Sequence, residues 1–178
     1  MAFESQPLLQ GTQVILEPLR TEHFEDLYAV ARDPEIWAQH PAPNRYVREN
    51  FQAFFEESLA SGGALVIREA QSGAMIGATR FHGFDPENSE VEIGWTFLSR
   101  NYWGGIYNRE AKSLMLEHAF RFVDRVVLLV DPTNLRSKRA VEKIGAVHVG
   151  ERENGAGAVN LLYELPKGLT YDQDAEYG

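Results

Sequence analysis

The stretch WGGIYNREAKSLMLEHAF, residues 103–120, joins a tight turn to a helix in the second half of the 178-residue chain. Its adjacent glycines, Gly104 and Gly105, let the backbone turn sharply and point successive N–H groups outward. A helix is predicted over residues 107–123, because apolar side chains recur there at helical spacing. These N–H groups coincide with the positive end of that helix, so they can hold a diphosphate by main chain alone. The buried stripe is predicted to contain Ala111, Leu114, Met115, His118, Ala119 and Phe122, with His118 packed and hydrogen-bonded.

The double-glycine turn does not by itself establish a ligand, because such a turn is more often only a tight connection. It is too short for an NTP-binding P-loop and lacks that loop's Gly-Lys-Ser/Thr ending, and it lacks the spaced triple glycine of a dinucleotide fold. A nucleotide-binding regulator is therefore the weaker interpretation, since neither a metal-binding acid nor a catalytic lysine accompanies the turn.

The segments around this turn predict an α+β fold with three layers, in which helices cover both faces of a mixed, mostly antiparallel sheet. The apolar run at residues 126–130 is typical of a central strand covered on both faces. Thr133 or Asn134 is predicted to cap the helix that follows, with Gly145 just past its end. The other predicted strands are residues 13–19, 64–69, 74–84, 91–98, 147–152 and 159–165, and the other helices run from a Thr21 cap to Ala31 and over residues 50–59.

Composition indicates one ordinary soluble domain, assigned to residues 1–165, followed by a polar, acidic tail at residues 166–178. The chain contains no cysteine, so disulfides, thiol nucleophiles and cysteine metal clusters are excluded. The histidines show no paired metal spacing, and no metal is expected. The sequence has no run long enough to span a bilayer and no signal peptide, so we expect a cytoplasmic protein with no membrane partner.

Charge is unevenly distributed along the chain, whose net charge is −9. Residues 100–143 contain nine of the seventeen Lys and Arg residues but only five acids, which gives +4 there and −13 elsewhere. The negative total argues against a general nucleic-acid binder. The local excess of positive charge indicates an anionic ligand at one place, and the acidic remainder favours a cationic ligand elsewhere. A scatter without function is the alternative explanation.

Two motifs together resemble the GCN5-related N-acetyltransferase (GNAT) superfamily: WGGIYNREAKSLMLEHAF, and DPTNLRSKRAVEKIGA at residues 131–146. The resemblance covers about residues 12–165 and is to the branch of the ribosomal-protein N-terminal acetyltransferases RimJ and RimL. It implies the GNAT fold and an acetyl-CoA-dependent N-acetyltransferase. It also implies main-chain contacts to the cofactor's pyrophosphate from Trp103, Gly104, Gly105, Ile106, Tyr107 and Asn108.

One position departs from the family turn, which usually reads Arg/Gln-x-x-Gly-x-Gly/Ala. Ile106 stands where the second small residue belongs. A side chain there would crowd the diphosphate unless Gly105 takes over the close approach.

Glu92 is the acid best positioned to act as a general base. Strict alternation along residues 91–98 predicts that Val91, Ile93, Trp95 and Phe97 share one face, which leaves Glu92, Gly94, Thr96 and Leu98 on the other. A glutamate at this position serves as the base in some members of the resembling family, whose strand also donates backbone N–H groups to the thioester carbonyl. That donor is expected at Ile93, Gly94 or Trp95. An acid on a solvated strand face is the alternative.

Asn134 and Ser137 lie one turn apart at the start of the predicted helix that follows residues 126–130. In the resembling family the matching Asn contacts the cofactor arm, and the matching Ser can protonate the departing thiolate. Other branches use a tyrosine four positions further along, where this chain has Val141, so Ser137 is the candidate here. The alternatives are that Asn134 is only a helix cap and Ser137 a bystander.

The acceptor pocket is expected to involve Trp37, His40, Arg80 and His82. The expected reaction is direct attack by a primary amine, either a protein N-terminal α-amine or a small amine, in a ternary complex. A terminal α-amine is roughly a quarter neutral near pH 7.4, whereas a lysine is only about 0.1% neutral, so the two make different demands on a base. A non-catalytic acyl-CoA-binding protein is the competing hypothesis, and a homodimer is possible.

Overall fold

The computed structural model describes residues 2–167, so most of the predicted acidic tail lies outside the described residues. Its strands form one eight-stranded sheet in the order β1-β2-β3-β4-β5-β6-β8-β7. The strands are β1 (Leu9–Gln10), β2 (Val14–Pro18), β3 (Ala64–Glu69), β4 (Met75–Asp85), β5 (Glu90–Leu98), β6 (Arg125–Val130), β7 (Val147–Glu153) and β8 (Val159–Pro166). The helices are α1 (Phe24–Ala31), α2 (Arg48–Ser61), α3 (Ile106–Ala119) and α4 (Leu135–Lys143), with short 3-10 turns η1 (Thr21–His23), η2 (Pro34–Ile36) and η3 (Arg100–Tyr102).

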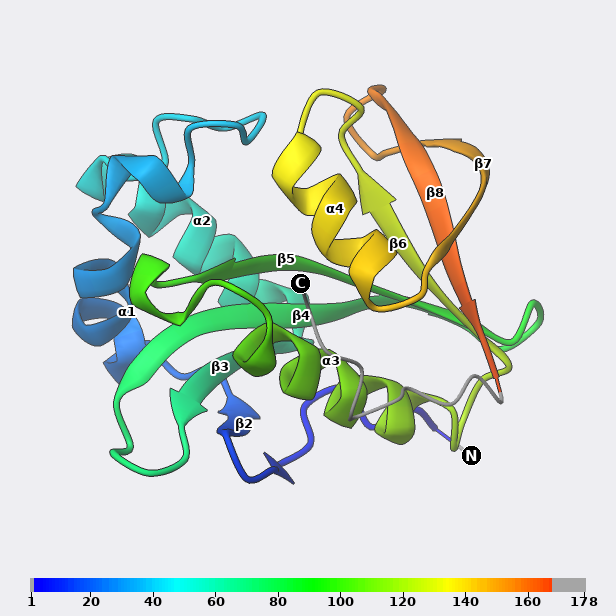
Figure 1. Ribbon diagram of the computed structural model, residues 1–178, viewed down its shortest axis with the longest axis horizontal. Helices are drawn as coiled ribbons and strands as arrows, with labels where there is room; N and C mark the ends of the chain where they lie inside the picture. The colour runs from blue at the N-terminus through cyan, green and yellow to red at the C-terminus, as the bar shows by residue number, and fades with distance from the viewer. Residues whose placement is uncertain (1, 168–178) are drawn as a thin grey trace.

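Two hydrophobic clusters lie on opposite faces of the sheet (Figure 1). Side chains of α3 and α4 pack in one cluster, together with Val126 and Leu128 of β6. Side chains of α1 and α2 pack in the other, which is built from aromatic rings such as Phe51 and Phe55. The predicted mixed sheet with helices on both faces is therefore confirmed. None of the helices within residues 2–167 is long and apolar enough to cross a membrane.

The sheet divides where β5 meets β6. These strands form the parallel pair of the described sheet, and their register runs over only Glu90↔Arg125, Val91↔Val126 and Glu92↔Val127. The neighbouring pairs on either side, β4 with β5 and β6 with β8, are antiparallel and longer. Beyond Glu92 the two strands are no longer paired, so their backbones leave space between them.

Most element boundaries match the sequence predictions, and the differences have local causes. Asn134 caps α4, since its side chain accepts a hydrogen bond from the Ser137 N–H, and Gly145 follows the helix with φ +90°. The cap predicted at Thr21 is wrong: Arg20 has the extended cap conformation, and a 3-10 turn precedes α1. The short strand β1 was not predicted, because two residues carry too little periodicity.

The alternation predicted for β5 is wrong beyond Gly94. Gly94 pairs with Arg80 and Phe97 pairs with Ala78, so two residues of β5 face one residue of β4. This is a β-bulge, and Trp95 adopts φ +54° within it. Val91 and Ile93 pack in the α3 cluster, whereas Phe97 packs in the α1–α2 cluster. The bulge thus reverses the facing of every residue that follows it.

Candidate active site

A cleft of about 850 Å³ opens where β5 and β6 separate. Its walls come from the bulged part of β5, the end of β6, the turn before α3, the first two turns of α4 and the loop after η2. The turn between β7 and β8 closes one end. Segments distant in the sequence therefore meet around one hollow.

The turn before α3 presents bare backbone to this cleft. Gly104 and Gly105 have φ of +107° and +125°, a region that side-chain-bearing residues rarely adopt. A Cβ built on either glycine would meet no atom within 4 Å, so the space beside them is open. No side chain of the described residues caps α3, and the first N–H groups of a helix have no intrahelical acceptor. This end of α3 is therefore suited to an anion.

The side chain of Ile106 does not crowd the turn. Ile106 begins α3, is 53% exposed and is absent from the cleft wall, whereas Gly105 lines it. The backbone at Gly105 is therefore open to the cleft, and the Ile106 side chain does not fill the space beside it. The ring of Tyr107 packs against that of Tyr102 with 4.9 Å between centroids, and Asn108 lines the cleft.

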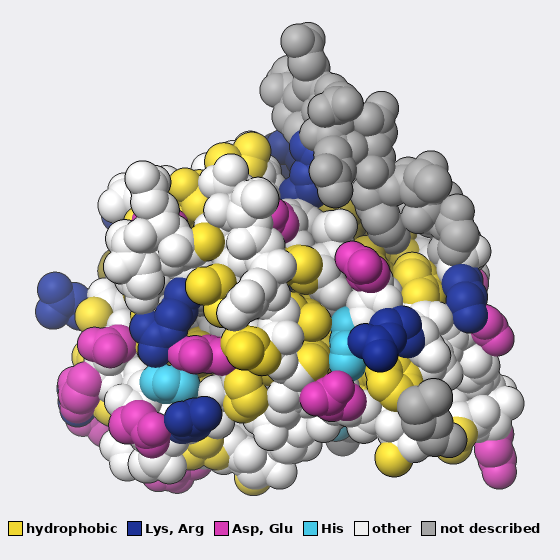
Figure 2. Space-filling model, turned by 90° about the horizontal axis from the view of Figure 1, so that it is seen from below, with side chains coloured by type: hydrophobic (Ala, Val, Ile, Leu, Met, Phe, Trp, Pro, Cys, Tyr) yellow, Lys and Arg dark blue, Asp and Glu magenta, His cyan; other side chains and the backbone are white. Residues whose placement is uncertain are grey.

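Basic side chains predominate on the cleft wall. They are Arg45, Arg109, Lys112, Arg136, Arg139, Lys143 and Arg152, against the acids Glu92, Asp131 and Glu153. On the face of the molecule seen from below the view of Figure 1, acidic and basic side chains are instead interspersed (Figure 2). The positive segment of the sequence therefore corresponds to a positive cleft in an acidic protein. Open backbone, an uncapped helix start and the Arg136 guanidinium, which stacks on Trp103 of this turn, fit the pyrophosphate and phosphate of coenzyme A.

Glu92 lies at the point where the two strands part, and its half-buried carboxylate lines the cleft. The pKa of Glu92 is raised to about 7, mainly by burial and to a smaller extent by the nearby Glu90, against the opposing charges of Arg152 and Arg80. A carboxyl group with this pKa exchanges a proton near neutral pH, as a general base must.

The bulge puts unusual backbone next to Glu92. Gly94 and Trp95 both line the cleft, and a Cβ on Gly94 would lie 3.4 Å from Glu92 Oε2. An aromatic residue at φ +54° is strained, and such strain is common at functional sites. The bulge also turns the side chain of Thr96 toward α3, where its hydroxyl accepts a hydrogen bond from Lys112 at 2.7 Å.

Asn134 and Ser137 both line the cleft at the start of α4. The Asn134 side chain is buried and is engaged in capping. Ser137 is half-buried, and Val141 packs in the α3–α4 cluster.

Two of the four residues expected at the acceptor pocket line the cleft, and two lie beneath its surface. His40 and His82 line the cleft. Trp37 is buried, donates its indole N–H to Ala31 O and packs on Phe97, so it supports the wall instead of contacting substrate.

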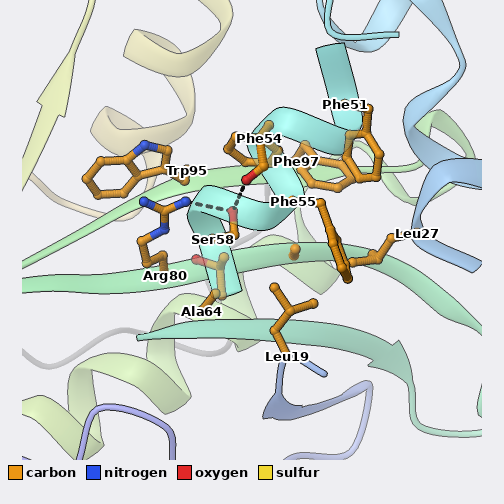
Figure 3. A pocket seen from close by; sticks show the side chains of 12 residues that line it. Leu19, Leu27, Phe51, Phe54, Phe55, Ser58, Ala64, Arg80, Trp95 and Phe97 are labelled. Atoms are coloured by element: carbon orange, nitrogen blue, oxygen red, sulfur yellow. Dashed lines mark hydrogen bonds between the residues drawn. The ribbon is translucent and has the colours of Figure 1, made fainter. Parts of the chain in front are cut away.

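Arg80, the other residue beneath the surface, is also buried. Its guanidinium bonds Ser58 Oγ at 2.7 Å and lies 4.3 Å from the Trp95 ring (Figure 3). It contacts the cleft only through Trp95 and through its charge, which acts on Glu92.

Lys112 was not anticipated from the sequence. It is buried on α3, lines the cleft and bonds only Thr96 and, at 3.3 Å, Asn108 among the described residues. Burial lowers the pKa of Lys112 to about 7. Lys112 precedes the buried Met115 and Leu116 by three and four residues, so it lies on the same face of α3. This spacing is the feature of the sequence from which its burial could have been predicted.

The split sheet, the glycine turn and the carboxylate in the cleft define an acyltransferase that binds a nucleotide-linked thioester. The family model of the acetyltransferase (GNAT) domain matches residues 13–147, so the chain belongs to this family. It is an N-acetyltransferase that uses acetyl-CoA.

Solved structures agree with this family. A "putative acetyltransferase" from T. thermophilus is 32% identical, with a TM-score of 0.73 and coverage of 94% of this chain and 92% of the other. A second acetyltransferase structure is 31% identical, with a TM-score of 0.75 and coverage of 94% and 89%. Mycobacterium smegmatis RimJ, solved with CoA-disulfide, shares the fold at 18% identity, with a TM-score of 0.65 and coverage of 86% and 82%. No protein of curated function matches the sequence.

Proposed function

We propose that this N-acetyltransferase catalyses direct attack of a primary amine on acetyl-CoA in a ternary complex, with Glu92 as the general base. The observation that carries the proposal is the burial of Glu92 at the parting of β5 and β6, which raises its pKa to about 7. At neutral pH a large fraction of Glu92 is ionised and can accept a proton, and with this pKa Glu92 is a stronger base than an exposed glutamate.

The residues proposed to hold acetyl-CoA belong to the turn before α3 and to the first turn of that helix. When bound, acetyl-CoA supplies an acetyl group activated as a thioester. Its pyrophosphate is assigned to main-chain N–H groups of the turn before α3. These belong to Gly104, Gly105, Ile106, Tyr107 and Asn108, whereas the N–H of Trp103, which the sequence also predicted, donates to Arg100 O at 3.1 Å.

The bulged strand and α4 complete the proposed machinery. A backbone N–H of Ile93, Gly94 or Trp95 donates to the acyl carbonyl oxygen and polarises it. Glu92 accepts the proton of the attacking amine, and the Ser137 hydroxyl donates a proton to the departing thiolate sulfur of coenzyme A. Asn134 keeps Ser137 in position by capping α4.

A RimJ/RimL-like role belongs to this proposal on the strength of the two motifs at residues 103–120 and 131–146. It favours an α-amine acceptor over a lysine side chain, because an α-amine is neutral far more often at physiological pH. A cytoplasmic homodimer is part of the same proposal.

The test is the Glu92→Gln variant, assayed by thiol release from acetyl-CoA with a panel of amines. We expect kcat to fall by about 10²- to 10³-fold, because general-base assistance is lost. Below pH 7 the wild-type rate should fall more steeply than that of the variant, because Glu92 becomes protonated in addition to the acceptor amine, whose protonation affects both proteins equally.

Glu151→Gln is the matched control, because Glu151 is an exposed acid on β7 and is absent from the cleft wall. It should retain wild-type kcat and its pH profile. Equal rates for Glu92→Gln and wild type, with coenzyme A affinity unchanged in both, would contradict the role of Glu92.

A further inference from the structure

Arg45 is a cation that faces the cleft without an anionic partner among the described residues. It lies in the loop between η2 and α2 and lines the cleft. Its guanidinium carbon lies 4.1 Å from the Phe54 ring centroid and 5.3 Å from that of Trp37. Burial lowers the pKa of Arg45 to about 10, so the group is still charged at neutral pH. The two rings thus hold a charged, flat guanidinium at the cleft wall.

The rest of the described chain does not neutralise this charge. Within residues 2–167 the Arg45 guanidinium makes no ion pair within 4 Å and no hydrogen bond. Glu57 is the acid whose charge acts on Arg45, but its carboxylate lies 3.4 Å from Arg80. Desolvating a cation without a counterion is unfavourable, so an anion arriving from the cleft gains an uncompensated partner.

The surroundings of Arg45 strengthen its preference for an anion. Arg45 and Arg136 both lower the pKa of His40, which burial already brings to about 4, so His40 is neutral. His40 Nδ1 accepts the Ala42 N–H, and its Nε2 therefore carries the hydrogen and can donate. Asp131 opposes these charges, but its Oδ1 accepts the N–H and hydroxyl of Thr133 at the entry to α4.

Arg45 lies on the acceptor side of the cleft. Arg136 stacks on Trp103, at the turn assigned to pyrophosphate, with 4.1 Å to the ring centroid. Arg45 instead stacks on Phe54 of α2, whose ring also faces Arg80 (Figure 3). The Arg80 guanidinium carbon lies 5.8 Å from the Phe54 ring and 4.3 Å from the ring of Trp95, so Arg80 stands between the Arg45 stack and the bulge beside Glu92.

We propose that the natural acceptor is an amine that also carries a carboxylate or phosphate, and that Arg45 binds this anionic group while Glu92 takes the amine proton. The assignment rests on the proposed function. A guanidinium fork matches the oxygens of either group through two parallel hydrogen bonds. Acceptors whose only charge is positive, such as polyamines, are poor substrates, although the acidic body attracts them.

The experiment compares amines in matched pairs that differ only in the anion. The carboxylate arm uses L-amino acids against their amides, and the phosphate arm uses phosphoethanolamine against ethanolamine. Thiol release from acetyl-CoA gives kcat and KM for wild type, Arg45→Gln and Arg45→Lys. For the wild-type protein, in at least one of the two arms, kcat/KM should be at least tenfold higher for the anionic amine than for its neutral partner.

In Arg45→Gln the ratio of kcat/KM between the anionic and the neutral amine should fall at least tenfold, mainly because KM for the anionic amine rises. The kcat/KM of the neutral amine should stay within twofold of the wild-type value. Arg45→Lys should fall between, because it keeps the charge but loses the fork. Arg32→Gln is the matched control, since Arg32 is exposed and lies outside the cleft wall. Calorimetry should give the same coenzyme A Kd for all four proteins.

Equal rates within every pair would overturn the acceptor assignment while leaving the proposed function intact. A weaker coenzyme A Kd in Arg45→Gln would also overturn it, because Arg45 would then serve the cofactor. Absence of thiol release with every amine would overturn the proposed function itself, and the acceptor assignment with it.

Discussion

At the scale of single residues, Lys112 is a buried cation in the cleft wall whose charged form burial disfavours. A buried ammonium without a carboxylate partner is unfavourable, and burial accordingly lowers the pKa of Lys112 from 10.5 to about 7. Between these two values the unfolded chain keeps a proton that the folded protein has released. The free energy of unfolding therefore rises with pH in this window.

Lys112→Met removes this titration while keeping a side chain of similar length. We expect the free energy of unfolding of wild type, relative to the variant, to increase by about 2 kcal/mol between pH 7 and pH 9. Urea denaturation at the two pH values measures it. Lys138→Met, whose lysine is not fully buried, is the control and should show a constant difference from wild type. Parallel curves for Lys112→Met and wild type would contradict the buried titration.

The sequence predicted Glu92 as the base and placed Arg80 and His82 on a strand beside it, but it did not predict the raised pKa of Glu92. That pKa depends first on burial in the assembled cleft and then on Arg152 and Arg80, which come from other strands. The bulge at Trp95 was equally invisible, because a side-chain period of two assumes regular pairing. Burial and charge are properties of the assembled cleft, so local patterns carry little of either.

At the scale of elements, helix ends were predictable and links between distant elements were not. Asn134 and Gly145 act within one turn of α4, and their residue types indicate that role. Glu110 gave no such signal. From α3 its carboxylate accepts the N–H groups of Thr12, Gln13 and Val14 at 2.9, 2.6 and 2.7 Å, across at least 96 residues of sequence.

The turn between β1 and β2 therefore depends on Glu110 and on the absence of a side chain at Gly11. A Cβ on Gly11 would lie 2.5 Å from Glu110 Cδ, and the three hydrogen bonds restrain that carboxylate from moving away. We expect Gly11→Ala and Glu110→Ser each to cost about 2 kcal/mol of stability. The double variant should cost at least about 1 kcal/mol less than the two single costs combined, because the clash disappears with the carboxylate.

Urea denaturation of the four proteins completes this double-mutant cycle. The expected coupling depends on the contact between position 11 and Glu110. Gly155→Ala combined with Glu110→Ser is therefore the control pair and should show additive costs, because Gly155 has open space around it and an ordinary φ. Additive costs for Gly11→Ala and Glu110→Ser would show that the turn tolerates a side chain there.

At the scale of the whole molecule, the cleft is the place where the sheet nearly divides in two. Only three residue pairs join β5 to β6, so the half with β1–β5 and the half with β6–β8 share a short backbone seam. Arg136 of α4 provides a second link. Its guanidinium donates to Ile36 O at 2.7 Å and stacks on Trp103, and its backbone N–H donates to Gln39 Oε1 at 3.2 Å. One side chain thus connects α4, the loop after η2 and the turn before α3.

Arg136→Met should loosen the cleft mouth without unfolding either half. Because this segment loses the guanidinium bond at Ile36 O and keeps only the bond from the backbone N–H of residue 136 to Gln39, amide hydrogen exchange over residues 36–45 should become about tenfold faster in the absence of coenzyme A, while β3 stays unchanged. Coenzyme A at 100 times its Kd should still stabilise wild type and variant by about 2.7 kcal/mol each. Arg139→Met is the control, because Arg139 also lines the cleft but makes no contact with this loop among the described residues. Unaltered exchange in Arg136→Met would mean that the Arg136 side chain does not restrain this loop, and that the hydrophobic cluster shared by the two halves is sufficient to hold it.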